Sequence, residues 1–242
     1  MSATSLLNDI ESMESCFQKK YYLIKISLEY SPSNESLENN LNVFSKFTSL
    51  YMKLRGNFKK KDDRIQNLIS KFLEYLKEQE TFYKNHSQYL TFKLLTLYVG
   101  IMKADFGMIK NVHKDILNYM DYHILKNGKF RDAMEHDSLY YQVDNLTQLC
   151  KIFTTLQKYG FYHFDYLHYH NMVGATILKA FLFLGPFIQK KKVHYEFLNS
   201  IFNEDRKNPS FGELWDPNCS KSLLENFGYL DKKLEHLNAS KN

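Results

Sequence analysis

The densest group of side chains that could do chemistry is the aromatic and histidine-rich stretch at residues 161–170. It contains His163, His168 and His170, and Asp165 stands among them. Imidazoles at i and i+2 of an extended segment, with a carboxylate nearby, could supply three ligands to a zinc ion. The sequence has no second group of ligands at matching spacing, and histidines beside aromatic residues usually pack or form hydrogen bonds. We therefore expect packing in this stretch and no metal site.

Other catalytic signatures do not occur in the sequence. There is no G-x-S-x-G motif for a serine nucleophile, no phosphate-binding loop and no dinucleotide fingerprint. Three cysteines, an odd number and far apart, give no disulfide framework and no CxxC site. Nothing in the pattern of residues alone therefore defines a cofactor, and we expect none.

The elements that must position these side chains are helices. The 242 residues include only 9 Gly and 4 Pro, which is too little turn punctuation for an all-β fold. We expect an all-α protein of about eight helices, forming a single domain over residues 1–242. The expected segments are residues 5–28, 36–54, 63–83, 87–103, 106–125, 137–158, 172–185, 195–203 and 220–236.

The segment at residues 137–158 is the most informative of these helices. Its apolar residues recur at 4-3-4-3 spacing and so lie on one face, and they are Leu139, Val143, Leu146, Cys150 and Phe153. The other face carries polar residues, among them Tyr141 and Gln148. Asp137 or Ser138 is the expected N-cap. The polar face could border a cleft or simply meet water.

The charge pattern excludes some partners. The formal net charge is +5, and the basic runs at residues 59–61 and 190–192 each stand beside a break in the pattern. Such runs are typical of solvated helix ends or loops, so we expect no nucleic-acid partner. The most apolar stretch, residues 172–188, is too short to span a membrane. Residues 1–16 show no signal peptide, which favours a soluble and intracellular protein.

Three stretches resemble the alginate-lyase family of polysaccharide lyases. The first is His-Asp-Ser-Leu-Tyr-Tyr-Gln-Val-Asp-Asn-Leu at residues 136–146. The second is the apolar segment at residues 174–187, which ends in Gly-Pro-Phe. The third is Glu-Leu-Trp-Asp-Pro at residues 213–217. Their order and spacing agree with the family, and the resemblance covers residues 84–230.

This resemblance implies an incomplete α/α toroid, in which antiparallel helix pairs surround a cleft. The family cleaves uronic-acid polymers by β-elimination without a metal or other cofactor. A proton leaves C5, next to the substrate carboxylate, and the leaving oxygen at C4 gains one. An Asn-His pair and an arginine neutralise the carboxylate, and a tyrosine acts as base and then as acid. The implied partner is an anionic polysaccharide or oligosaccharide.

Residue by residue, the resemblance assigns Asn85 and His86 to the Asn-His pair and Tyr141 to the catalytic tyrosine, with Tyr140 as the alternative. Arg131 is assigned to the arginine, although the family's arginine stands closer to its tyrosine. His136 is nearer that point and could replace the arginine only when protonated. The side chains expected to contact sugar are Tyr140, His136, Gln148, His168, Tyr169 and His170.

Other interpretations of these residues remain open. Asn85-His86 stands in a polar stretch that would cap a helix in any helical protein, and Tyr141 could be an ordinary surface or packing tyrosine. The protein could therefore be a lyase, or an inactive helical domain of the same ancestry that binds carbohydrate or protein. A third hypothesis is a helical interaction protein unrelated to lyases.

Overall fold

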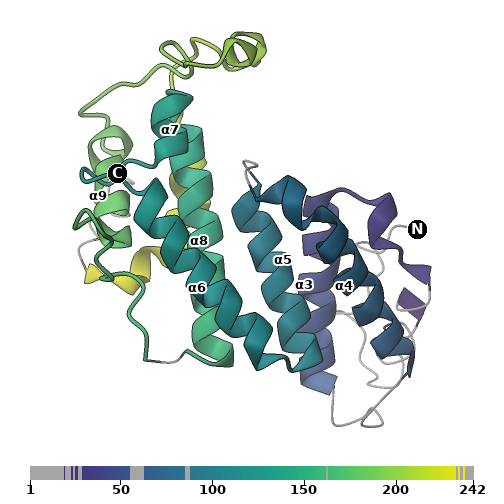
Figure 1. Ribbon diagram of the computed structural model, residues 1–242. Coiled ribbons are helices and arrows are strands. Elements are labelled where there is room, and N and C mark those ends of the chain that lie inside the picture. Colours follow the sequence, from purple (N-terminus) through teal and green to yellow (C-terminus); the bar gives the residue numbers. More distant parts are fainter. Residues whose placement is uncertain are drawn as a thin grey trace. The chain divides into compact units, whose positions relative to one another are not determined.

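The computed structural model describes residues 29–54, 63–84, 88–161 and 163–232, and also residues 19, 23, 25, 26, 234 and 237. These residues form eight α-helices and four short 3-10 helices, and their only extended pairings are two isolated bridges. The all-α prediction is confirmed. The contacts group the chain into two compact units, Met1–Val112 and His113–Asn242, and the boundary falls inside one helix (Figure 1). The expectation of a single domain stays a prediction.

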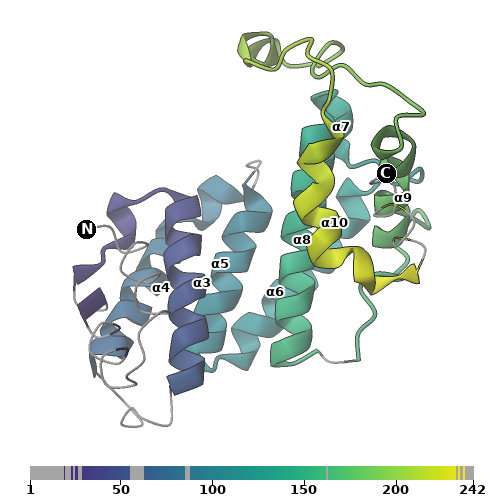
Figure 2. The same cartoon turned by 180° about the vertical axis from the view of Figure 1, so that it is seen from behind.

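The first unit is built on three helices, α3 (Leu37–Leu54), α4 (Asp63–Tyr83) and α5 (Tyr89–Lys103), preceded by the 3-10 helix η1 (Pro32–Asn34). α5 packs against both α3 and α4, and Figures 1 and 2 show the three side by side. The predicted bounds of these helices hold to within two residues. The helix expected at residues 5–28 falls largely outside the described residues.

Aromatic side chains fill the core of this unit. Phe44 of α3 and Phe72 of α4 are fully buried, with ring centroids 4.1 Å apart. Phe72 also stacks on Tyr30 at 5.8 Å, and the Tyr30 hydroxyl donates to the buried amide oxygen of Asn40 at 2.7 Å. Burial raises the pKa of the Tyr30 phenol, and the nearby carboxylate of Glu35 adds to the shift. The apolar stripes of the sequence thus form a core with few polar groups.

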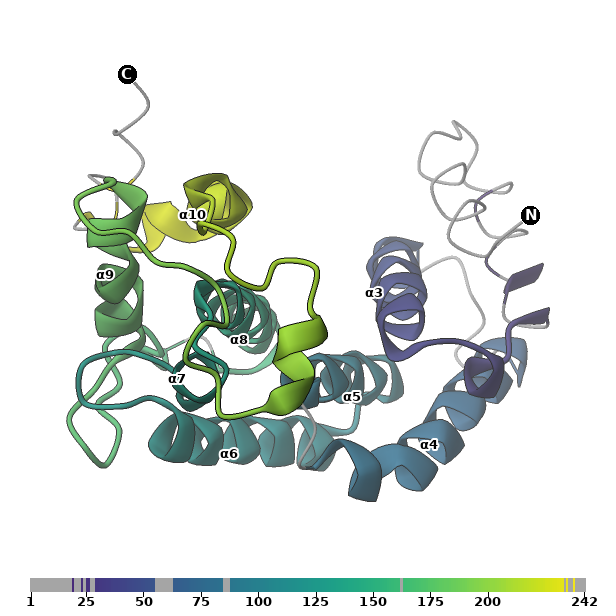
Figure 3. The same ribbon diagram turned by 90° about the horizontal axis from the view of Figure 1, so that it is seen from above.

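The second unit surrounds one central helix, α8 (Leu139–Tyr159). α8 contacts the short helix α7 (Arg131–Glu135), α9 (Ile177–Ile188), α10 (Lys221–Phe227) and the 3-10 helix η4 (Pro217–Ser220). Figure 3 shows α7, α9 and α10 around α8. The other elements are α6 (Phe106–His123), which crosses the unit boundary, η3 (Asn203–Lys207) and η5 (Gly228–Leu230).

The sequence left open whether the polar face of α8 meets water or borders a cleft, and the central position of the helix buries part of its polar side chains. The predicted apolar stripe is buried throughout. On the other faces, Gln142 is fully buried and Asn145 is 4% exposed. The Gln142 side chain accepts from Phe130 N at 2.8 Å and donates to the carbonyls of Gly128 and Ala180 at 3.0 and 3.2 Å. A helix packed on several sides buries polar residues where they find such partners.

Three further helix predictions need correction. The helix expected at residues 220–236 is shorter, because α10 ends at Phe227 and the 3-10 helix η5 follows it. The segment at residues 172–185 begins later, at Ile177, because the Thr176 hydroxyl accepts from Lys179 N and caps the helix there. The short helix expected at residues 195–203 is wrong. Tyr195 forms an antiparallel bridge with Leu214, and Phe197 has a φ of 65°, which a helix cannot contain.

Residues 190–216, which we call the arm, leave the end of α9 and return to η4. Figures 1 and 2 show the arm extending past α7 within the second unit. Inside the arm, Glu196 N donates to Glu213 O at 2.9 Å and Trp215 N to His194 O at 2.9 Å. These bonds and the Tyr195–Leu214 bridge hold its two sides together.

Candidate functional site

The site residues predicted from the resemblance are only partly described by the structure. Asn85 and His86 lie outside the described residues, so their assignment stays a prediction. Tyr141, Tyr140, His136 and Arg131 belong to α7, α8 and the junction between them. The structure therefore tests the surroundings of the tyrosine and not those of the Asn-His pair.

His136 and Tyr141, which the sequence proposed as parts of one site, are in contact. Their rings stack with centroids 4.4 Å apart and an interplanar angle of 19°. Phe202 of the arm covers the other face of the imidazole, also at 4.4 Å. His136 Nδ1 lies 2.7 Å from Asp205 Oδ2, and the hydroxyl of Ser200 donates to the same oxygen. A buried carboxylate beside Nδ1 fixes the orientation of the imidazole. Nε2 is then the ring nitrogen that can exchange a proton with a substrate.

The backbone at the α7–α8 junction explains why these side chains meet. Asp137 has a φ of 47°, a left-handed conformation that turns the chain sharply between the two helices. Its carbonyl accepts from Phe197 N at 2.8 Å, and its carboxylate accepts from the Asn199 backbone and side chain at 2.9 and 3.0 Å. Ile201 N donates to Glu135 O at 3.0 Å. The junction thus fixes the arm, and the arm brings Phe202 and Asp205 onto His136.

Ser138 is the N-cap residue of α8, one of the two predicted from the sequence, but the capping hydrogen bond comes from a side chain of the arm. Glu196 Oε1 accepts from Leu139 N at 3.0 Å, and Ser138 makes no side-chain cap. Burial raises the pKa of this carboxyl, against the stabilising influence of Ser138, His194 and the backbone N–H groups of α8. The positive end of a helix normally favours the ionised carboxylate. The upward shift of the pKa therefore follows from the burial of Glu196, which is 4% exposed.

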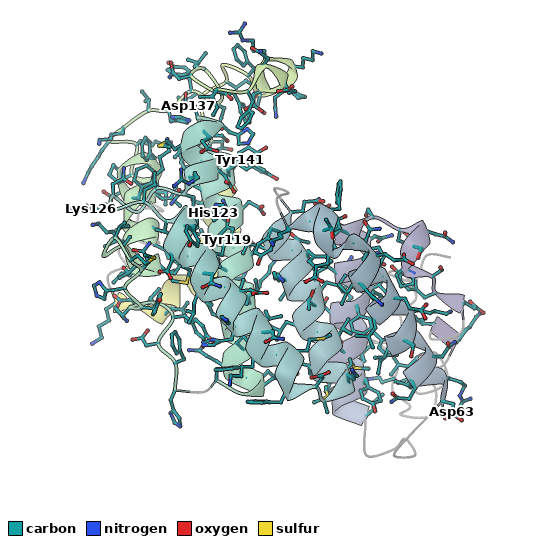
Figure 4. The ribbon with its side chains drawn as sticks, in the orientation of Figure 1. Asp63, Tyr119, His123, Lys126, Asp137 and Tyr141 are labelled. Atoms are coloured by element: carbon teal, nitrogen blue, oxygen red, sulfur yellow. The ribbon has the colours of Figure 1, made fainter. Side chains whose placement is uncertain are left out.

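A second polar cluster lies beside the first, where α6 and α7 face α8. Tyr119 stacks on His123 at 4.1 Å and donates to Asn145 Oδ1 at 3.1 Å. Asp132 lies within 3.5 Å of Tyr119 and of Asn145, and 3.6 Å from His123 Nδ1. Figure 4 shows Tyr119 and His123 on α6 and Tyr141 near the start of α8. The cluster carries another imidazole and another carboxylate next to the predicted site.

The charges around Tyr141 are mostly negative. Burial raises the pKa of its phenol, and the carboxylates of Asp205, Asp132 and Asp144 raise it further. Burial also pushes the pKa of Asp132 upward, but contacts with His123, Asn145 and His136 bring it below its ordinary value. Tyr141 is consequently a neutral phenol that carries a proton to donate.

Arg131 and Gln148 are engaged elsewhere. The Arg131 side chain donates to Tyr122 O at 3.3 Å and pairs with Glu135 at 3.8 Å, and it is about half exposed. Gln148 donates to Asp144 Oδ1 at 3.3 Å, while its own Oε1 is buried without a hydrogen-bond partner. Tyr140 is 59% exposed and meets the edge of Tyr141. Of the predicted sugar contacts, Tyr140 is therefore the most accessible ring next to Tyr141.

The histidine-rich stretch forms its own structure. His168 Nδ1 lies 2.9 Å from Asp165 and its Nε2 lies 3.2 Å from Asp231, so both ring nitrogens face carboxylates. Tyr169 packs on Phe164 at 5.8 Å, and His170 is exposed. Among the described residues, no group of three or more His, Cys, Asp or Glu side chains is arranged to hold a metal ion. His168 ties two segments together, which leaves its nitrogens little capacity to bind sugar.

Several residues of the site carry no signal in the sequence. Asp205 stands in a run of charged residues, Asn-Glu-Asp-Arg-Lys, that is typical of a solvated loop, yet its side chain is only 10% exposed. Glu196 is likewise buried, and the side chain of Asp132 is only 23% exposed, which is less than is usual for acidic residues. The one usable hint was the pair of aromatic residues Phe197 and Phe202, which stand a few residues before Asp205.

Comparison of the chain with protein-family models, curated proteins and solved structures found no match. The class that the fold and the site define is therefore an all-α protein with a histidine–aspartate pair and a tyrosine at a helix junction. None of the described helices is long and apolar enough to cross a membrane.

Proposed function

We propose that the protein is a polysaccharide lyase that cleaves a uronic-acid polymer by metal-independent β-elimination. The observation that supports this proposal is the cluster of His136, Asp205 and Tyr141, which combines an oriented imidazole with a neutral phenol. It falls in the stretch at residues 136–146 that carries the strongest resemblance to alginate lyases. We also propose that the helices form the incomplete α/α toroid of that family.

The environments of the two groups suggest their roles. His136 is the better base, because Asp205 holds its Nδ1 and stabilises the imidazolium that forms when Nε2 takes a proton. Tyr141 is assigned as the acid, because its surroundings raise the phenol pKa and so keep the proton on the phenol until the leaving oxygen takes it. This assignment differs from the single tyrosine that acts as base and acid in the family.

These two residues account for every proton that moves in the reaction. His136 Nε2 accepts the proton from C5, the C4–O bond breaks, and the Tyr141 hydroxyl protonates the leaving oxygen. The products are a C4–C5 double bond and a new hydroxyl end. Proton transfer from the His136 imidazolium to the Tyr141 phenolate then restores both groups. The substrate carboxylate needs a positive partner, and Asn85 and His86 are proposed for that role.

The test is an assay for the unsaturated uronate product. The full chain is incubated with a panel of uronic-acid polymers while the ultraviolet absorbance of the new double bond is followed. We expect activity on at least one polymer, and a loss of roughly 100-fold or more in Tyr141→Phe and His136→Gln. Tyr122→Phe, an exposed tyrosine on α6, is the matched control and should keep full activity. A flat trace on every polymer would reject the lyase proposal.

A specific observation favours a second candidate, an inactive binding domain of the same ancestry. Asp205, Asp132 and Asp144 surround Tyr141 with negative charge, and Arg131 is paired with Glu135. Such a site repels a uronate and suits a neutral sugar or a protein. Calorimetric binding of neutral oligosaccharides, weakened by Tyr140→Ala and accompanied by no turnover of uronates, would favour this candidate over the lyase.

A further inference from the structure

The arm exposes far more apolar surface than a solvated loop requires. Six large hydrophobic side chains within it are between 38% and 69% exposed, namely Val193, Tyr195, Leu198, Ile201, Phe211 and Leu214. Isolated exposed hydrophobic residues are normal, but a group of them in one segment marks an interaction surface.

These side chains are neighbours in space and not only in sequence. Tyr195 and Leu214 face each other across the antiparallel bridge, so their side chains stand on the same side of the ribbon. Leu198 lies against Gly212, next to Phe211, within 3.7 Å of the position that a Cβ would take there. We call the six exposed side chains on these two sides of the arm the apolar patch.

Hydrogen bonds to the α7–α8 junction hold the backbone of the patch in place. Its backbone bonds to the α7–α8 junction through Phe197, Asn199 and Ile201, and Trp215 is buried beneath it with 6% exposure. An apolar surface fixed in this way cannot turn inward to escape water. It stays exposed unless another segment or another molecule covers it.

Basic residues border the patch on both sides. Lys190, Lys191 and Lys192 directly precede Val193, and Arg206 and Lys207 follow Ile201, and all five are exposed. Three acidic residues of the arm are exposed, namely Glu204, Glu213 and Asp216, whereas Glu196 and Asp205 are buried. The exposed formal charge of the arm is therefore 5 − 3 = +2.

We propose that the arm docks the protein on an anionic lipid surface. Aliphatic side chains enter the boundary between headgroups and acyl chains, while lysines bind acidic headgroups. A sugar polymer would stack on aromatic rings and gain little from Val193, Leu198 and Ile201. A protein interface would be depleted of lysine. The combination of exposed aliphatic residues with a lysine run therefore favours lipid, and this proposal does not depend on the lyase activity.

The test is flotation of the full chain with vesicles of phosphatidylcholine alone and of phosphatidylcholine with about one third phosphatidylserine. We expect binding to the anionic vesicles only. Replacing Lys190, Lys191 and Lys192 by Ala should weaken binding on the order of 100-fold, since each lysine near a charged surface is worth about fivefold. Replacing Lys110, Lys114 and Lys151 by Ala, which are also exposed, is the charge-matched control.

A second variant tests the apolar contribution. Leu198→Ser with Ile201→Ser should weaken vesicle binding at least tenfold, because both side chains are more than half exposed. The emission of Trp215, the one tryptophan of the chain, shows whether the arm of each variant stays folded.

Three results would overturn the proposal. One is absence of binding to the anionic vesicles. Another is binding that the serine variant leaves unchanged and that a soluble polyuronate displaces, which would indicate an electrostatic polymer site. The third is a dimer in light scattering that the serine variant dissociates, without vesicle binding, which would indicate a second copy of the chain.

Discussion

The two units of the molecule are stabilised in different ways. In the first unit, α3, α4 and α5 meet through aromatic and aliphatic side chains, and the Phe44–Phe72 contact stands at its centre. In the second unit, polar side chains join segments remote in sequence, as in the His136–Asp205 and Leu139–Glu196 contacts. Apolar packing depends on pattern and volume, whereas a polar contact depends on the exact partner. The first unit should therefore tolerate conservative change better than the second.

The largest expected effect is loss of the aromatic core in the first unit. Phe72→Ala should cost about 3–5 kcal/mol of folding free energy, because a fully buried ring is replaced by a cavity. Denaturant unfolding followed by circular dichroism should shift strongly. Phe82→Ala, on the same helix but 59% exposed, is the matched control. Equal shifts in the two variants would contradict an apolar core centred on Phe72.

Removal of the buried amide in the second unit should come next. Gln142→Leu keeps the volume but leaves Phe130 N, Gly128 O and Ala180 O without their partner. We expect a loss of about 2–3 kcal/mol, since each unsatisfied buried group is costly. The measurement is unfolding followed by Trp215 emission, which reports on the second unit. Gln157→Leu, a partly exposed glutamine of the same helix, should lose less.

A smaller effect should follow from Glu196→Gln, and it should depend on pH. Because the fold raises the pKa of Glu196, the protonated side chain stabilises the folded protein. This stabilisation is complete below the pKa of the unfolded chain and is lost as the pH rises through the pKa of the folded protein. The glutamine variant keeps an acceptor for Leu139 N without this loss. Its melting temperature relative to the natural protein should therefore rise between pH 4 and pH 8. A difference independent of pH would show that the fold does not raise the pKa of Glu196.

The smallest expected effect concerns His168. Its Nδ1 lies 2.9 Å from Asp165 and its Nε2 lies 3.2 Å from Asp231, so the side chain joins two segments that are remote in sequence. His168→Gln should cost about 0.5 kcal/mol, because the pairs are exposed. Hydrogen exchange near Asp231 should become faster in the variant, while His170→Gln should leave it unchanged. Identical exchange in both variants would contradict a tie through His168.

The spacing of apolar residues in the sequence was sufficient to predict much of the fold. It gave α4 with its observed bounds and the buried stripe of α8, because apolar residues at helical spacing must face a core. It failed at residues 195–203, where Phe197 and Ile201 resemble a helix face but the backbone follows the α7–α8 junction. Local pattern does not encode a partner 60 residues away. The same limit explains why the sequence suggested a capping side chain at Asp137 or Ser138, whereas the capping hydrogen bond goes to Glu196.

For the candidate site, the sequence by itself determined the helical class and brought His136 and Tyr141 into consideration as neighbours along one turn of chain. Only the tertiary structure decided what surrounds them: Asp205 on the imidazole, carboxylates near the phenol, and Arg131 engaged with Glu135. The reason is physical. Helix formation follows from side-chain spacing within a few residues, but burial and charge depend on which distant segments pack together, and these two quantities set what a titratable group can do.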